Sequence, residues 1–142
     1  MNSIERTIRR ALPHERDRVN AFYAAEGRSV RANEGEDWVL ALEGAEVVGV
    51  LRVCSEEGHQ VLRTVQIAES KQRQGIGRQM LDCAVPLLEP GPCFCLPYAY
   101  LTDFYGRIGF VEIPEREAPP HLRARLGGYR QQGRDMIVMR RG

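Results

Sequence analysis

The residues best suited to chemistry in this sequence lie between an apolar run that ends at Ile67 and another that begins at Ile76. Two glycines one residue apart, Gly75 and Gly77, stand at the start of the second run. A helix that begins there leaves its first backbone N–H groups without partners and presents the positive end of its dipole. Glycine lets an anion approach those groups without a Cβ in the way. The spacing predicts a turn that binds the pyrophosphate of a nucleotide cofactor. Its residues are Gln72, Arg73, Gln74, Gly75, Ile76, Gly77 and Arg78.

Two common phosphate-binding motifs do not fit this turn. A P-loop needs Gly-x-x-x-x-Gly-Lys-Ser/Thr, which the sequence does not contain. A dinucleotide fingerprint, Gly-x-Gly-x-x-Gly, would place its third glycine at Met80, a side chain too bulky for close packing of the helix on its strand. An oxidoreductase that uses a dinucleotide is therefore disfavoured.

The spacing Gln72-x-x-Gly75-x-Gly77 resembles instead the acetyl-CoA signature of the GNAT N-acetyltransferase superfamily, Gln/Arg-x-x-Gly-x-Gly/Ala. The segment Phe104-Tyr105-Gly106-Arg107-Ile108-Gly109-Phe110 is similar to that superfamily's downstream Phe-Tyr-x-x-x-Gly-Phe element, and it follows a predicted strand as it does there. The resemblance covers about residues 4–113 and the last strand. It implies acetyl-CoA as cosubstrate and direct transfer of the acetyl group to a primary amine of a small molecule, amino acid or peptide in a ternary complex.

The resemblance also implies roles for single residues. The strand before the turn is expected to splay from its neighbour, so that backbone groups of Val65, Gln66 and Ile67 pair with pantetheine and polarise the thioester carbonyl. Tyr105 matches a tyrosine that serves many members as general acid for the departing thiolate. A phenol, with a pKa of about 10, is protonated at neutral pH and can donate. The structural alternative is a core aromatic residue. The family usually has a larger residue at the position of Gly106.

Fewer motifs indicate which residues would bind the acceptor amine. Arg63 could hold an acceptor carboxylate through its forked guanidinium, or could instead form a cross-strand ion pair. The strand 62–67 contains no acid, so the candidates for a general base are His59, Glu26 and the acids of 33–37, with a water relay as the default. The resemblance also implies that segments 28–37 and 114–134, which are irregular and show no evident core role, wall the amine pocket. Their arginines favour an acceptor with a carboxylate or another anionic group over a polycation; these are Arg28, Arg31, Arg123, Arg125 and Arg130.

A chain of 142 residues fits one domain, taken here as 1–142. The resemblance implies a mixed α/β fold: a central twisted, mostly antiparallel sheet of about six to seven strands, splayed at the cofactor site, with helices on both faces. From periodicity and turn residues we expect strands at 4–10, 38–42, 46–54, 59–67, 93–98, 109–113 and 135–140. Helices are expected from 12 to 26, from 75 to an end or kink near Val85 imposed by Pro86, and at 102–107, with one or two helical turns within 119–126.

Composition narrows the classes of partner and compartment. The net charge of +1 offers no electrostatic basis for binding nucleic acid or an anionic membrane. No apolar run approaches the roughly 18 residues of a spanning helix, and the N-terminus has no signal-peptide core, so we expect a cytoplasmic protein. Cys54, Cys83, Cys93 and Cys95 lie in apolar patterns and read as reduced structural thiols, with no second ligand pair for a metal. A homodimer is left open.

The leading prediction is thus an acetyl-CoA-dependent N-acetyltransferase. The alternative is a CoA-binding domain that senses or regulates without catalysis. The missing acid on the strand 62–67 leaves room for this alternative, whereas Tyr105 argues against it.

Overall fold

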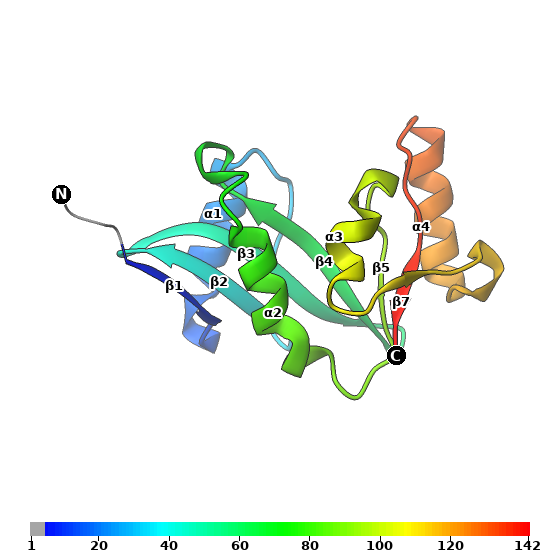
Figure 1. Cartoon of the computed structure of the whole chain (residues 1–142), viewed down its shortest axis with the longest axis horizontal. Coiled ribbons are helices and arrows are strands. Elements are labelled where there is room, and N and C mark those ends of the chain that lie inside the picture. Colours follow the sequence, from blue (N-terminus) through cyan, green and yellow to red (C-terminus); the bar gives the residue numbers. More distant parts are fainter. Residues whose placement is uncertain (1–4) are drawn as a thin grey trace.

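A single seven-stranded sheet runs through the computed structural model, which describes residues 5–142 (Figure 1). Its strands lie in the order β1-β2-β3-β4-β5-β7-β6. Only β4 and β5 are parallel; every other neighbouring pair is antiparallel. The predicted sheet, mostly antiparallel and of six to seven strands, is confirmed. The strands are β1 Arg6–Arg10, β2 Asp37–Glu43, β3 Glu46–Glu56, β4 His59–Ile67, β5 Cys93–Cys95, β6 Val111–Glu112 and β7 Met139–Arg141.

The α-helices cover both faces of this sheet, as predicted. They are α1 Arg16–Ala25, α2 Ile76–Leu88, α3 Thr102–Gly106 and α4 Pro120–Gln131. Alternate side chains of β2 separate two cores: Val39 packs with α2 and α3, whereas Leu40 packs with α1 on the other face. Val61 of β4 packs with α4, and its cross-strand partner on β3 is Cys54. Cys54 lies on the same face of β3 as Val50, which packs with α1. Helices α1 and α4 therefore share one face, and α2 and α3 share the other.

The strand ends differ from the predictions at several places. Ile4, where the first strand was predicted to begin, lies outside the described residues. The predicted strands at 93–98 and 109–113 are shortened to β5 and β6, and the predicted strand 135–140 begins later and ends one residue later, as β7. Tyr98 and Met136 still form an isolated bridge. The predicted strand 59–67 is confirmed as β4. The loop 28–36 is irregular, as predicted, and contains no helix.

Helix α2 does not end at Val85. It continues through Pro86 to Leu88 because Leu88 is fully buried in the core under the sheet. Pro86 removes one backbone donor, but Pro86 and Asp82, one turn earlier, are both exposed, so water can satisfy the freed carbonyl. The free-energy cost of a proline inside the helix is thus offset by the packing of Leu88.

The segment 114–134 has a larger structural role than predicted. In place of one or two turns it holds a 12-residue helix, α4, preceded by a 3-10 helix at Glu115–Glu117. Leu122 and Leu126, four residues apart, are fully buried and form a third core cluster with Val61 and Phe94. The prediction that this stretch lacks a core role was wrong, because only two apolar positions mark its buried face.

All four cysteines are free thiols. Burial raises the pKa of the Cys54 and Cys93 thiols to about 12, which fits the structural role predicted for them. Within residues 5–142 no group of three metal-ligating side chains comes together, and no helix is long and apolar enough to cross a membrane.

Candidate active site

The sheet opens between β4 and β5. The two strands pair only at Gln60–Cys93 and Val61–Phe94, and β5 ends at Cys95. The rest of β4, residues 62–67, therefore presents unpaired backbone groups to the gap. The carbonyl of Ile67 illustrates this, because it accepts a hydrogen bond from the side-chain amide of Gln72 at 3.2 Å instead of one from a neighbouring strand. The predicted splay is present.

A β-bulge bends β4 at the same place. Val50 of β3 pairs with Gln66, but Arg52 pairs with Arg63, so Thr64 and Val65 together oppose Leu51. An extra residue of this kind turns a strand away from its former direction and disrupts the ladder locally. The bulge thus contributes to the separation of β4 from β5.

The two glycines of the turn before α2 meet different structural requirements. Gly75 adopts φ +79° at the N-cap, and a Cβ there would meet no atom within 4 Å, so its position is open to an approaching anion. A Cβ on Gly77 would lie 3.0 Å from the ring of Phe104 and 3.3 Å from Ile67. Gly77 therefore leaves room for the neighbouring helix α3. This contact was not predicted from the sequence.

A groove of about 660 Å³ runs from this turn along β4 on the α2 and α3 face. Its walls include Val65, Gln66 and Ile67, and every predicted turn residue except Gln74. The Gln74 side chain instead accepts a hydrogen bond from Arg6 at 3.1 Å and does not line the groove. The sequence did not predict several other wall residues, of which only Phe104 belongs to a recognised motif: Lys71, Tyr98, Tyr100, Leu101 and Phe104. We call this cavity the cofactor groove.

A second cavity of about 610 Å³ lies where the α1 and α4 face meets the gap. It is lined by the start of the loop after α1, by Arg63 and Thr64 of β4, and by Arg125, Tyr129 and Arg134 at α4. Both segments expected to wall an acceptor pocket therefore contribute, each with part of its length. We call this cavity the acceptor pocket. It shares Arg28, Tyr98 and Tyr105 with the cofactor groove, so the two cavities meet through the gap in the sheet.

The charged residues that line the acceptor pocket are all arginines: Arg28, Arg63, Arg125 and Arg134. Arg63 and Arg125 both bind Glu56, at 3.0 and 2.8 Å. Burial opposes ionisation of Glu56, but these guanidinium groups outweigh it and lower its pKa. Arg63 thus forms the cross-strand ion pair that was its alternative reading, while it also borders the pocket.

Three arginines predicted to line the pocket do not do so. Arg31 is absent from its walls, Arg123 donates to the carbonyl of Arg116 at 3.1 Å, and Arg130 pairs with Glu115. Helix α4 turns the side chains of Arg123 and Arg130 away from the pocket, and this helix was not predicted at its full length. Arg134 takes part in their place, and its guanidinium lies 5.5 Å from the centre of the Tyr129 ring.

Tyr105 lies at the junction of the two cavities and is 7% exposed. Its ring makes edge contacts with Phe104 and Phe110, at centroid distances of 5.0 and 6.1 Å. Burial raises the pKa of its hydroxyl above the ordinary value, so the group stays protonated at neutral pH. Tyr105 is therefore both a core residue and a neighbour of the gap between β4 and β5.

The candidate general bases lie elsewhere. Burial opposes ionisation of Glu36, but two hydrogen bonds from Arg52 outweigh it and lower the pKa of Glu36 to about 2. Glu26 accepts the backbone N–H of Glu69 at 3.1 Å, and His59 packs against the rings of Phe94 and His121. Among the described residues, the walls of the cofactor groove and the acceptor pocket carry no carboxylate and no imidazole.

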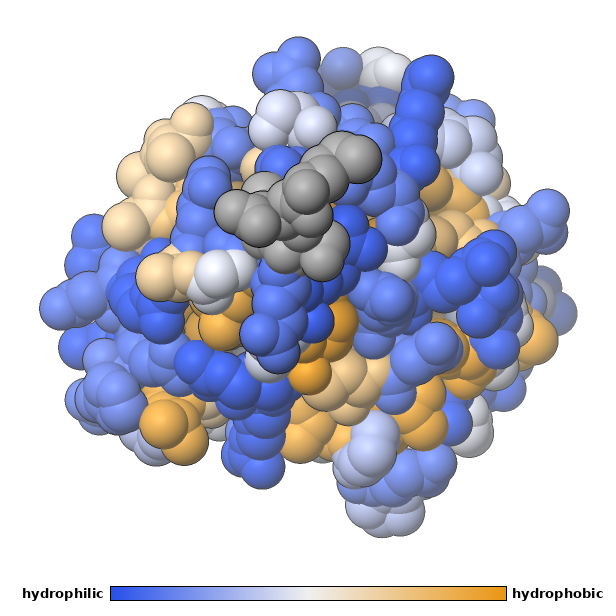
Figure 2. All heavy atoms as spheres, turned by 60° about the vertical axis from the view of Figure 1, so that its left-hand side comes forward, coloured by the Kyte–Doolittle hydropathy of each residue, from blue (hydrophilic) through white to orange (hydrophobic). Residues whose placement is uncertain are grey.

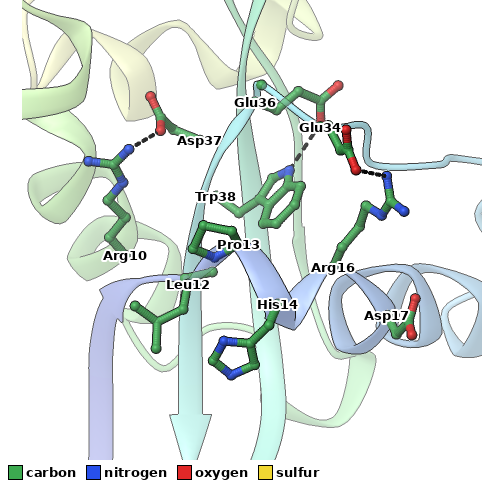
Figure 3. Close-up of a pocket in the computed structure, with 12 residues that line it drawn as sticks. Arg10, Leu12, Pro13, His14, Arg16, Asp17, Glu34, Glu36, Asp37 and Trp38 are labelled. Carbon is green, nitrogen blue, oxygen red and sulfur yellow. Dashed lines mark hydrogen bonds and ion pairs between the residues drawn. The ribbon is translucent and has the colours of Figure 1, made fainter.

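A third cavity, of about 770 Å³, lies at the start of α1 and shares no wall residue with the other two (Figure 3). Two ion pairs lie at its rim, Arg10 with Asp37 and Arg16 with Glu34, and the Trp38 indole donates to Glu36. Figure 3 shows these pairs, with Pro13 and His14 between them. This cavity is separate from the gap between β4 and β5.

Comparison with known proteins agrees with this architecture. The family model described as an acetyltransferase (GNAT) domain matches residues 13–122. N-acetylglutamate synthase from Neisseria gonorrhoeae, solved with coenzyme A and N-acetyl-glutamate, is similar with a TM-score of 0.67 and 17% identity over 99% of this chain, which spans only 35% of that one. An acyl-CoA N-acyltransferase from Pseudomonas aeruginosa has a TM-score of 0.63 and 20% identity over 99% of this chain and 100% of that one.

A GNAT-family acetyltransferase from Streptococcus pneumoniae is also similar, with a TM-score of 0.69 and 15% identity over 96% of this chain and 98% of that one. At these identities the solved structures show a shared fold. The family model adds the sequence match over most of the chain. The chain therefore belongs to the GNAT family of acetyltransferases, which transfer an acyl group from an acyl-CoA to an amine.

Proposed function

We propose that the protein transfers an acetyl group from acetyl-CoA to the primary amine of a small molecule, amino acid or peptide that also carries a carboxylate or another anionic group. The observation that carries this proposal is the meeting of two cavities from opposite faces of the sheet at Arg28, Tyr98 and Tyr105. Such an arrangement lets a thioester and an amine meet directly, without a covalent enzyme intermediate. A single domain over 1–142 and a cytoplasmic location belong to the same proposal.

On the cofactor side, the pyrophosphate would lie at the open N-terminus of α2 beside Gly75, Arg73 and Arg78. The pantetheine arm would follow the unpaired edge of β4, pairing with backbone groups of Val65–Ile67. A backbone N–H of this edge would polarise the thioester carbonyl. The free edge and the open turn support these assignments, since both line one groove.

In the chemical step, the neutral amine nitrogen attacks the thioester carbon, and the carbon–sulfur bond then breaks. The Tyr105 hydroxyl gives its proton to the departing thiolate, and water removes the proton from the nitrogen. Within residues 5–142, no acid or imidazole lines the pocket to take that second proton. The surrounding guanidinium groups would instead lower the pKa of the bound ammonium group, because like charges disfavour its charged form.

The acceptor class follows from the charge of the pocket. Four arginines border it, and the single carboxylate of Glu56, which Arg63 and Arg125 share, offsets only one of their charges. The excess positive charge favours an anionic acceptor, and a guanidinium binds carboxylate through two parallel hydrogen bonds. By analogy, the similarly folded N-acetylglutamate synthase is solved with N-acetyl-glutamate, an acetylated amino dicarboxylate.

The test is release of free thiol from acetyl-CoA across matched amines. Glutamate, aspartate and short acidic peptides would be compared with their esters or amides, which keep the amine and lose the carboxylate, and with spermidine. We expect kcat/KM to be at least about tenfold higher for the carboxylate form of each pair. If spermidine is the best substrate, the acceptor class is wrong, although the transferase assignment stands.

A non-catalytic CoA-binding domain is the second candidate. It is favoured by one observation, the absence of a carboxylate or imidazole from the cavity walls among the described residues. Calorimetric binding of acetyl-CoA, without thiol release for any amine of the panel, would select this candidate.

A further inference from the structure

Thr64 has an unusual backbone conformation for its place in the chain. Its φ is +52°, in the left-handed region, although it lies in the middle of β4. In the part of the chain that the structure describes, the other non-glycine residues with positive φ are Glu57 and Arg73, and both lie in turns. A bulge of this type normally has glycine at the left-handed position, and a β-branched residue there is strained. Such strain persists only where the surroundings impose it, and it is concentrated at functional sites.

The first of these surroundings is Tyr23 of α1. Its hydroxyl donates a hydrogen bond of 2.7 Å to the backbone carbonyl of Thr64. The Tyr23 side chain is fully buried, so losing this bond would leave two polar groups without partners. Burial raises the pKa of the Tyr23 hydroxyl, which keeps it a donor.

The second is a buried ion pair. Arg52 of β3 is 4% exposed, and it donates to Glu36 at 3.0 Å from Nε and at 2.7 Å from Nη2. Its remaining nitrogen, Nη1, lies 3.4 Å from the hydroxyl oxygen of Thr64. Glu36 is held in turn by the indole N–H of Trp38 at 3.0 Å. Helix α1, strand β3 and the loop before β2 thus converge on one residue of β4.

This anchoring sets the direction of the next peptide group. The bond between Thr64 and Val65 is trans, so the carbonyl of Thr64 and the N–H of Val65 point in opposite directions. Tyr23 draws the carbonyl toward the α1 face. The Val65 N–H then points toward the opposite face, which holds the cofactor groove that Val65 lines.

We infer that Tyr23, together with the Arg52–Glu36 pair, is a positioning device that holds Thr64 left-handed and thereby aims the Val65 N–H at the acyl carbonyl. The inference rests on the proposed function, since it presupposes a thioester in the groove. None of these three side chains lines the cofactor groove, so each acts through Thr64.

The principal test is Tyr23→Phe, which keeps the ring and removes only the hydroxyl. We expect kcat to fall about tenfold to a hundredfold, the range for losing or misplacing one oriented donor, while the Kd for CoA changes less than about threefold. Val19→Ala is the matched control, because Val19 lies in the same helix and the same core cluster as Tyr23 and its side chain has no hydrogen-bonding group. It should lower stability and leave kcat unchanged.

Rescue of kcat by a second substitution distinguishes a positioning role from a general loss of structure. Glycine adopts φ +52° without support, so the double variant Tyr23→Phe/Thr64→Gly should regain most of the lost kcat. Wild-type kcat in Tyr23→Phe would overturn the inference. A loss that Val19→Ala matches, or that Thr64→Gly does not restore, would also overturn it by showing a merely structural role.

Amide hydrogen exchange gives a readout that does not need turnover. Tyr23→Phe should accelerate exchange at residues 64–66 beyond the acceleration in Val19→Ala, because the bulge loses its anchor. Equal exchange in the two variants would contradict the inference. If the wild-type protein acetylates no amine but shows this difference, the proposed function fails while the anchoring of Thr64 stands.

Discussion

At the residue scale, Tyr105 shows how one side chain serves both packing and chemistry. Its ring belongs to the core formed with Phe104 and Phe110, and its edge reaches the junction of the two cavities. The rigid ring is a suitable carrier for a proton donor, because its contacts fix where the hydroxyl can lie. The sequence offered these two roles as alternatives, and the geometry is compatible with both.

We therefore expect Tyr105→Phe to lower kcat roughly tenfold to a thousandfold, since it removes one acid and nothing else. Steady-state kinetics under conditions where chemistry limits the rate would measure this. Calorimetry should show an unchanged Kd for CoA, and thermal unfolding an almost unchanged midpoint, because the ring contacts remain. A variant with full kcat would leave Tyr105 with its core role alone.

At the element scale, the start of α2 combines two requirements within three residues. Gly75 turns the chain and leaves the first N–H groups of the helix open, whereas Gly77 gives room to α3. A bulky residue at Gly77 would displace Phe104 as well as any phosphate, so a loss of affinity there would have two explanations. A change of charge beside the turn isolates the electrostatic part.

For this reason we predict that Arg78→Glu weakens CoA binding about tenfold to a hundredfold, because it places a negative charge where a pyrophosphate would lie. Titration calorimetry at two salt concentrations measures the effect, which should shrink at high salt. Arg107→Glu is the control: Arg107 is also exposed and lies near α2, 3.9 Å from Asp82, but it does not line the groove. Equal losses in both variants would argue against a phosphate site at the turn.

At the scale of the whole molecule, arginine–carboxylate pairs join different elements of the fold. Arg52 of β3 binds Glu36, Arg9 of β1 binds Glu15 before α1, and Arg125 of α4 binds Glu56 of β3. The surface itself is mostly hydrophilic on the side shown in Figure 2, with hydrophobic residues between the hydrophilic ones. These pairs make the stability of the fold sensitive to acid.

Glu15 gives this sensitivity a measurable form. Hydrogen bonds from Arg9 at 2.7 and 2.9 Å, and a backbone N–H from Leu12, lower the pKa of Glu15 from its ordinary value of 4.5 to about 2. A carboxylate with a depressed pKa in the folded state stabilises it above pH 4.5, and this contribution is lost as pH falls toward 2.

We expect the free energy of unfolding to decrease between pH 4.5 and 2, and Glu15→Gln to remove roughly 1–3 kcal/mol of that decrease. Urea denaturation across this pH range provides the measurement. Glu34→Gln is the control, since the Glu34 side chain is 90% exposed, and it should keep the wild-type dependence. A Glu15→Gln variant with the full wild-type slope would show that Glu15 does not carry the effect.

Much of the architecture follows from local patterns. The apolar stretch of β4, the glycine turn and the stripe of α2 carry their own periodicity and turn chemistry, so their place and type were predictable. Predictions were poorest where long-range packing overrides local preference. The burial of Leu88 stabilises α2 beyond Pro86. The burial of Leu122 and Leu126 stabilises a helix in a segment whose sequence is typical of a loop.

The sequence by itself indicated the family and the segments on which the proposed cofactor side rests, because both depend on backbone geometry that a few contiguous residues encode: Gln72, Gly75 and Gly77 at the turn, and the strand before them. Only the tertiary structure decided which arginines line the acceptor pocket, why Thr64 can be left-handed, and that Tyr105 stands between the two cavities. Each of these depends on side chains from separate elements, such as Tyr23 and Arg52 at Thr64. Contacts between residues far apart in the chain leave no periodic mark in the sequence, so they appear only when the sheet is assembled.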